Sequence, residues 1–166
     1  TAKDMERIFV SPGFDLGRFL AHYENWATVL NCLGVCFRMQ SSRLYDLPLC
    51  AEIYSAATGI TQSPEEFLKA AERAYNIYRA ANAREGFSRK DDRFPQRWLE
   101  QLKRPDKGED SVLKDYFGTG PVSAQDVEGI LDRYYQEKGW DVKTGIPSQS
   151  KLAELGLGYV AEALKI

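Results

Sequence analysis

Residues 15–36 read DLGRFLAHYENWATVLNCLGVC and carry the first long helical pattern of the chain. Apolar side chains recur there every three or four residues, the spacing of one face of an α-helix. They are Leu16, Phe19, Leu20, Tyr23, Trp26, Ala27, Leu30 and Leu33. Gly34 is a natural stop, because glycine readily adopts the left-handed backbone that ends many helices. The pattern predicts an amphipathic helix over residues 15–33, with Cys36 just past the turn.

Capping signals predict three further long helices. The clearest is at Ser63, because serine can cap a helix, Pro64 suits the first helical position and Glu66 can close a capping box. An aspartate cap starts a shorter pattern before Gly59, and a serine–aspartate pair starts another that runs up to Gly139. The predicted helices cover residues 46–57, 63–84 and 123–139.

Shorter segments complete the predicted fold. Short helices are expected near residues 96–102, 148–155 and 159–164. Residues 103–121 are polar and rich in glycine and proline, which predicts an extended surface connection with room for one turn of helix. Trp140 should pack back on the helix before it. No alternating strand pattern or internal repeat is found, so the predicted class is all-α, in a single helical domain over residues 1–166.

Composition excludes several functional classes. The 22 basic and 24 acidic residues nearly cancel, so no net field favours nucleic acid or an anionic membrane. No run approaches the roughly 20 apolar residues that cross a bilayer. Three cysteines in a chain of 166 residues favour a reducing compartment, by default the cytoplasm. The chain begins at Thr1 and continues at once into an apolar stretch, which is typical of a fragment of a longer protein.

The cysteines and the single histidine cannot complete a metal cluster by themselves. Zinc sites need four ligands and iron–sulfur clusters usually take four thiolates. Cys50 lies inside an apolar pattern and is expected to be a small buried side chain. Cys36 is harder to place, because after a glycine turn it could be buried or could bind metal, with backbone amides free to face a ligand. His22 is expected to be a surface or hydrogen-bonded residue without catalytic function.

A second unusual block, NAREGFSRKDDRFPQR, covers residues 82–97. Residues 84–97 place five basic side chains among three acidic ones. On physical grounds this is a loop held by ion pairs and capping bonds rather than an anion site. Burial at an interface would explain it better than full exposure, because arginine suits partly desolvated pairing with carboxylates.

Together the two blocks resemble the C-terminal domain of the aldehyde ferredoxin oxidoreductases, which are tungsten or molybdenum bis-pterin enzymes with a [4Fe–4S] cluster. Residues 31–36, NCLGVC, are similar to the family's Asp-x-x-Gly-Leu-Cys motif. Residues 82–97 are similar to its run Asn-x-Arg-Glu-Gly-Phe-x-Arg-Lys-Asp-Asp-x-x-Pro-x-Arg. Residues 57–59, 139–141 and 145–147 also follow in the family's order. The resemblance extends from the first predicted helix to about residue 157.

The resemblance implies a cofactor-binding segment made of Asn31, Gly34, Val35 and Cys36. It makes Cys36 one of four cluster ligands, with the other three in an earlier domain. The motif's acidic residue contacts a pterin ring, and Asn31 stands in its place. Val35 replaces a leucine. For residues 84–97 the resemblance implies structural importance without a ligand, and it carries no catalytic residue onto this chain.

The function implied by the resemblance is oxidation of aldehydes to carboxylic acids, with ferredoxin as electron acceptor. The missing N-terminal domains of the same chain would be partners, and homo-oligomers are left open. Residues 1–166 alone are expected to hold no cofactor and to be inactive. Two alternatives stay open: a subunit of a benzoyl-CoA reductase-like enzyme of the same family, and a stand-alone helical binding module without redox activity.

Overall fold

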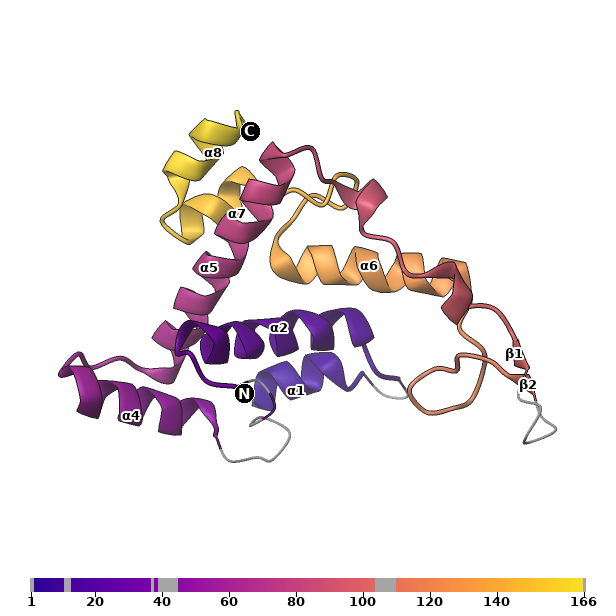
Figure 1. Ribbon diagram of the computed structural model, residues 1–166, viewed down its shortest axis with the longest axis horizontal. Helices are drawn as coiled ribbons and strands as arrows, with labels where there is room; N and C mark the ends of the chain where they lie inside the picture. The colour runs from indigo at the N-terminus through magenta and orange to yellow at the C-terminus, as the bar shows by residue number, and fades with distance from the viewer. Residues whose placement is uncertain (1, 11–12, 37, 39–44, 104–109, 166) are drawn as a thin grey trace.

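The computed structural model describes residues 2–10, 13–36, 38, 45–103 and 110–165, and they form a mainly helical structure (Figure 1). The long helices are α2 (Leu16–Cys32), α4 (Leu47–Thr58), α5 (Pro64–Arg84) and α6 (Ala124–Lys138). The short ones are α1 (Ala2–Ile8), α7 (Gln149–Glu154) and α8 (Gly158–Leu164). The predicted all-α class is confirmed. No helix in the described part of the chain is long and apolar enough to cross a membrane.

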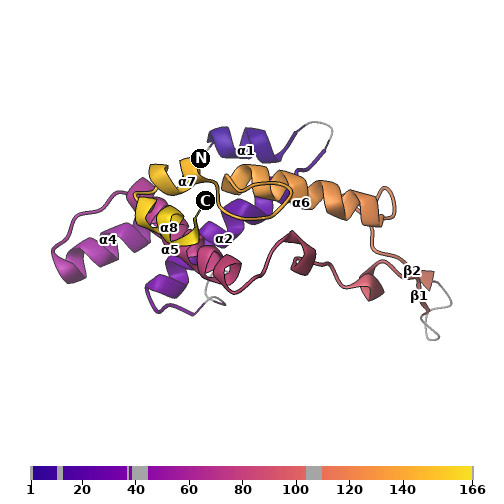
Figure 2. The same ribbon diagram turned by 90° about the horizontal axis from the view of Figure 1, so that it is seen from above.

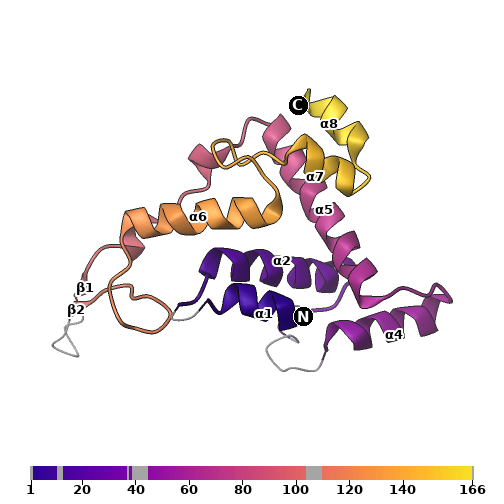
Figure 3. The ribbon, with the colours of Figure 1, turned by 180° about the vertical axis from the view of Figure 1, so that it is seen from behind.

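Helix α2 is the central element. It packs along α6 on one side, and α1 lies along its other side (Figures 1 and 3). The C-terminal end of α2 crosses α5. α7 and α8 pack against each other and α8 contacts α5, whereas α4 projects from one end of the molecule (Figure 2). The interior of the described part thus lies where α2, α5 and α6 meet.

The predicted starts of the long helices are confirmed. Local hydrogen bonds at the capping residues fix each of them. The Ser63 hydroxyl accepts from the Glu66 N–H at 3.2 Å, and the Glu66 carboxylate accepts from the Ser63 N–H at 2.7 Å. Ser123 and Asp126 form a second capping box at the start of α6. These bonds satisfy N–H groups that have no partner inside a helix.

Two small apolar clusters form much of the core. One joins α2, α4 and α5 through Val29, Ala51, Phe67 and Ala71. The other lies in the C-terminal segment and contains Leu152, Leu155, Leu157 and Ala161. Their burial holds α4 and the last two helices against α5.

The segment between α5 and α6 differs from the prediction. The expected helix over residues 96–102 is a single 3-10 turn, η2 (Gln96–Trp98), that follows another, η1 (Arg89–Asp91). β1 (Leu102–Lys103) then pairs antiparallel with β2 (Asp110–Ser111), where no strand was predicted. Two-residue strands are too short to produce an alternating pattern. The predicted helical turn within residues 103–121 is absent from residues 110–121, and residues 104–109 lie outside the described part. Helix α1 was also not predicted.

The crossing of α2 and α6 requires a residue without a side chain at Gly17. A Cβ atom there would lie 2.5 Å from the Ile130 carbonyl oxygen and 2.8 Å from the Tyr134 backbone nitrogen. Both atoms belong to the α6 backbone, so neither can move aside alone. Gly17 therefore sets the distance between the two helices.

We expect Gly17→Ala to lower the free energy of unfolding by about 2 kcal/mol, because the added methyl group pushes α2 and α6 apart. Gly158→Ala is the matched control, since a Cβ there meets no described atom within 4 Å. The control should change stability by less than about 0.5 kcal/mol. Urea denaturation followed by circular dichroism measures both, and equal stabilities for the two variants would contradict this packing.

Candidate functional site

The predicted cofactor-binding segment is a rigid turn at the C-terminal end of α2. The Val35 N–H donates to the Leu30 carbonyl at 2.9 Å, and the Gly34 N–H donates to the Asn31 carbonyl at 3.1 Å. Gly34 has φ of 70°. This pair of bonds around a left-handed glycine is a Schellman motif. The predicted helix stop is therefore confirmed, but the expectation of free backbone amides is wrong for Gly34 and Val35, whose N–H groups are both used.

The structure places the side chains of this turn near the surface. Asn31 and Cys36 are exposed, and Val35 is half-buried. Cys36 lies beyond the helix, whereas Cys32, also exposed, is the last residue of α2. The Cys36 thiol is thus available to a group bound outside this domain. Within the described residues, no three His, Cys, Asp or Glu side chains form a group that could hold a metal ion.

The other candidate ligands behave as expected structural residues. Cys50 is buried, and desolvation together with the nearby Asp46 carboxylate raises the pKa of its thiol. His22 hydrogen-bonds Glu137, with 3.2 Å between its Nε2 and the carboxylate oxygen. The predicted burial of Cys50 and the predicted hydrogen-bonded position of His22 are confirmed.

The charged block contributes to a network that joins four segments of the chain. The Arg79 guanidinium, on α5, forms a two-pronged ion pair with the Asp92 carboxylate and donates through Nε to the Gly145 carbonyl at 2.7 Å. The Tyr135 hydroxyl, on α6, donates to the same carboxylate. Arg79 and Tyr135 are both buried. This network locks the segment after η1 against α5, α6 and the loop before α7.

Arg89 makes a second connection from the same block. Its guanidinium donates to the Asp132 carboxylate at 2.5 Å, the Glu128 carboxylate at 2.6 Å and the Val142 carbonyl at 2.7 Å. The predicted loop held by ion pairs is therefore confirmed, but most partners lie outside the block. Sequence reasoning missed Arg79 and Tyr135. The available signal was Arg79 itself, a charge four residues after Tyr75 on the apolar stripe of its helix.

Electrostatics favour the ionised form of this network. Burial alone would raise the pKa of the Asp92 carboxyl, but the hydrogen bonds from Arg79 and Tyr135 outweigh it and hold the pKa below its ordinary value. Burial and the neighbouring carboxylate raise the pKa of the Tyr135 hydroxyl, which stays protonated and can donate. Asp92 thus acts as a fixed anion between two donors.

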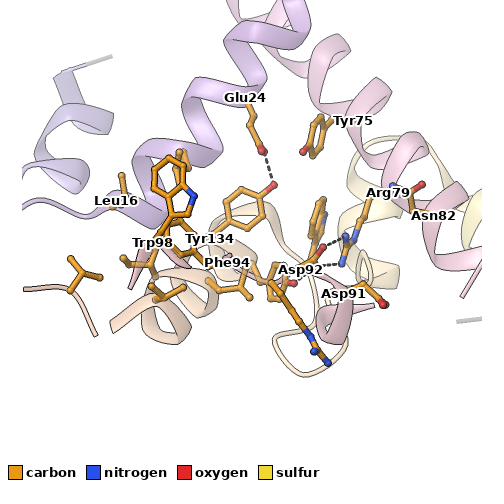
Figure 4. Close-up of a pocket in the computed structure, with 18 of the residues that line it drawn as sticks. Leu16, Glu24, Tyr75, Arg79, Asn82, Asp91, Asp92, Phe94, Trp98 and Tyr134 are labelled. Carbon is orange, nitrogen blue, oxygen red and sulfur yellow. Dashed lines mark hydrogen bonds and ion pairs between the residues drawn. The ribbon is translucent and has the colours of Figure 1, made fainter. Parts of the chain in front are cut away.

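A cavity of about 560 Å³ opens beside this network (Figure 4). α2, α5, α6 and the segment containing η1 and η2 line it, and most of the lining is apolar. In Figure 4, Leu16 and Trp98 lie at one side and Arg79, Asn82 and Asp91 at the other. The α2 residues that line it lie in the first half of the helix, so the cavity is separate from the turn of residues 31–36.

The similarity to known proteins covers both the turn and the charged block. Residues 5–157 match the model of the family described as aldehyde ferredoxin oxidoreductase, domains 2 and 3. A tungsten-containing aldehyde ferredoxin oxidoreductase of Pyrococcus horikoshii is 34% identical over 142 residues, which cover 81% of this chain and 20% of the relative. The corresponding enzyme of Thermococcus kodakarensis is 33% identical over 147 residues, or 84% of this chain and 21% of the relative. The chain thus spans about a fifth of these relatives' length.

A solved structure is also similar. It is an active-site complex of benzoyl coenzyme A reductase with 1,5-dienoyl-CoA, and it matches with a TM-score of 0.54 and 28% identity. The match covers 72% of this chain and 15% of that chain. The likeness therefore extends to sequence as well as fold.

We expect Asp92→Asn to lower the free energy of unfolding by about 3 kcal/mol, because it leaves the buried Arg79 guanidinium without a counter-charge. Asp91→Asn is the matched control, since among the described residues the Asp91 carboxylate accepts only from the Ser88 N–H at 2.9 Å, a bond that the carboxamide oxygen can also accept, so this change should cost less than about 1 kcal/mol. Urea denaturation near neutral pH compares them. A smaller loss for Asp92→Asn than for Asp91→Asn would refute the network's importance.

The Asp92 carboxyl should also make the stability of the protein depend on pH. Because folding lowers the pKa of Asp92 below 3.8, its contribution is complete above that pH and is lost as the pH falls through the folded pKa. The native protein should therefore lose more stability than Asp92→Asn between about pH 5 and pH 2. Parallel stability curves for the two proteins over this range would show that Asp92 is not the group responsible.

Proposed function

Because the chain belongs to the aldehyde ferredoxin oxidoreductase family, we propose that it is the C-terminal domain of a tungsten-pterin, iron–sulfur oxidoreductase. In this proposal the complete enzyme oxidises aldehydes to carboxylic acids and passes the electrons to ferredoxin. The observation that carries the proposal is the exposed Cys36 thiol directly after a rigid helix-ending turn. Residues 1–166 then form one helical domain of a longer chain.

Cys36 would supply one thiolate of a [4Fe–4S] cluster. Such a cluster takes four thiolates, so other domains of the enzyme must supply three. The residues present fit this role, because the Schellman bonds of Gly34 and Val35 fix where the chain leaves α2. A ligand on a fixed backbone loses only its side-chain rotation on binding, so it loses less conformational entropy than a ligand on a mobile loop.

Asn31 would contact a pterin ring from the last turn of α2. A carboxylate accepts hydrogen bonds on both oxygens, whereas the Asn31 carboxamide offers one accepting oxygen and one donating nitrogen. One of the two contacts that an acidic residue makes is therefore lost or inverted. Gly34 and Val35 would contribute the shape of the segment, because both of their N–H groups are already bonded within the turn.

Only four residues separate Asn31 from Cys36, so one turn could hold a pterin and a cluster next to each other. When bound, the tungsten-pterin and the cluster supply the redox chemistry, and the protein supplies binding and orientation. Asn31 orients the pterin and Cys36 fixes the cluster on the same short segment. This arrangement favours electron transfer between them.

A second candidate function is reduction of an aromatic acyl-CoA by a subunit of the same family. The similarity to the benzoyl coenzyme A reductase complex, at 28% identity, favours it. Assays of the complete gene product separate the two functions. Aldehyde-dependent reduction of ferredoxin supports the first, and reduction of an aromatic acyl-CoA without aldehyde oxidation supports the second.

We expect Cys36→Ser in the complete gene product to lower its iron content from about four atoms per chain and to weaken its broad visible absorption, because the cluster loses a thiolate. Cys32→Ser is the matched control, since Cys32 is also an exposed thiol but ends the helix itself. Iron analysis and spectra after anaerobic purification give the answer. Unchanged iron in Cys36→Ser, or equal losses in both variants, would end the cluster assignment.

A further inference from the structure

The cavity beside the Arg79 network has the composition of a small-molecule site. Its volume of about 560 Å³ lies within the roughly 300–1,000 Å³ of most such sites. The aromatic side chains that line it are Tyr75, Tyr78, Phe94, Trp98, Tyr134, Tyr135 and Trp140. Phe94 and Trp98 meet edge to face, with 5.8 Å between their ring centroids. The cavity can therefore surround a flat apolar ring.

The inner wall of the cavity is fixed before any ligand arrives. The Trp140 indole N–H donates to the buried Asn76 carboxamide at 2.9 Å, and the Arg79 guanidinium lies 5.0 Å from the Trp140 ring. The Tyr134 hydroxyl donates to Glu24 at 2.5 Å. Because these polar groups are already paired, an apolar ring can cover them without leaving a broken hydrogen bond.

Asn82 and Arg93 are among the polar side chains that line the cavity and remain available. Among the described residues, none accepts from or donates to the Asn82 carboxamide. Arg93 donates through Nε to the Lys90 carbonyl at 2.5 Å, but no carboxylate in the described ranges pairs with its guanidinium. A guanidinium presents further N–H donors in a fork that matches a carboxylate. Arg79, in contrast, is already occupied by Asp92.

We propose that this cavity binds a small aromatic or alicyclic carboxylate. The ring lies among Phe94, Trp98 and Tyr134, and the carboxylate is held by Arg93 with the Asn82 amide as a second donor. A concave wall with the buried residues Arg79, Tyr135 and Trp140 at its base fits a small ligand better than a flat protein surface. The site lies apart from residues 31–36 and does not rest on the proposed function, so either can fail alone.

Benzoate is the probe, and benzyl alcohol is the matched compound that keeps the ring but has no charge. Heteronuclear NMR of the 166-residue chain follows the Trp98 indole N–H, which Trp98→Phe identifies among the three tryptophans. Benzoate should shift this signal with a Kd of about 1 mM, as expected for a ligand of this size. Benzyl alcohol should bind more weakly.

Two variants and their controls test the contacts. Arg93→Gln should raise the Kd for benzoate about tenfold and change the Kd for benzyl alcohol by less than about twofold, because only the charged contact is lost. Arg97→Gln, an exposed arginine of the same block outside the cavity lining, should change neither. Trp98→Ala should weaken both compounds, whereas Phe117→Ala, another exposed aromatic outside the lining, should not.

Three outcomes overturn the proposal. The first is no shift of the Trp98 signal at about 10 mM benzoate, ten times the expected Kd. The second is benzoate binding that Arg93→Gln leaves unchanged. The third is a dimer seen by light scattering that Trp98→Ala dissociates and benzoate does not, since the cavity would then be a contact between protein chains.

Discussion

The buried guanidinium of Arg79 is the constraint on which the centre of the structure depends. A charge removed from water costs several kcal/mol unless it is paired and hydrogen-bonded. Arg79 meets this requirement with partners that are distant in sequence, the Asp92 carboxylate and the Gly145 carbonyl, and Tyr135 supports the carboxylate from α6. Four chain segments must therefore assemble together. Gly145 shows how closely they approach, because a Cβ atom there would lie 2.5 Å from an Arg79 nitrogen.

This network explains the charged block in structural terms. Asp92 and Arg89 fix the segment after α5 to α6, and the neighbouring Phe94 and Trp98 are thereby held over the cavity. The turn of residues 31–36 has a different basis. Its two bonds are local to the end of α2, and it depends on the rest of the fold only through the packing of that helix on α5 and α6. The turn proposed to bind cofactor and the aromatic cavity thus lie in separate regions.

The sequence predicted features that rest on local chemistry and missed those that rest on contacts between distant residues. The caps at Ser63 and Ser123 and the stop at Gly34 need only a few neighbouring residues, so their patterns were sufficient. The partner of Asp92 is Arg79 in the preceding helix, and no local pattern identifies such a pair. The short strands were missed because two residues are too few to show an alternating pattern. The proposed role of Cys36 came from family resemblance. The position of Cys36 in the structure shows an exposed thiol and does not by itself identify a ligand.

We propose that the turn after α2 presents Cys36 to an iron–sulfur cluster completed by other domains. Crystals of the complete enzyme, measured at the iron absorption edge, test this directly, because anomalous density locates each iron atom without reference to the assignment. We expect iron bonded to the Cys36 sulfur, with Asn31 at an adjacent pterin. A cluster bound entirely by other residues, with Cys36 out of bonding distance, would contradict it.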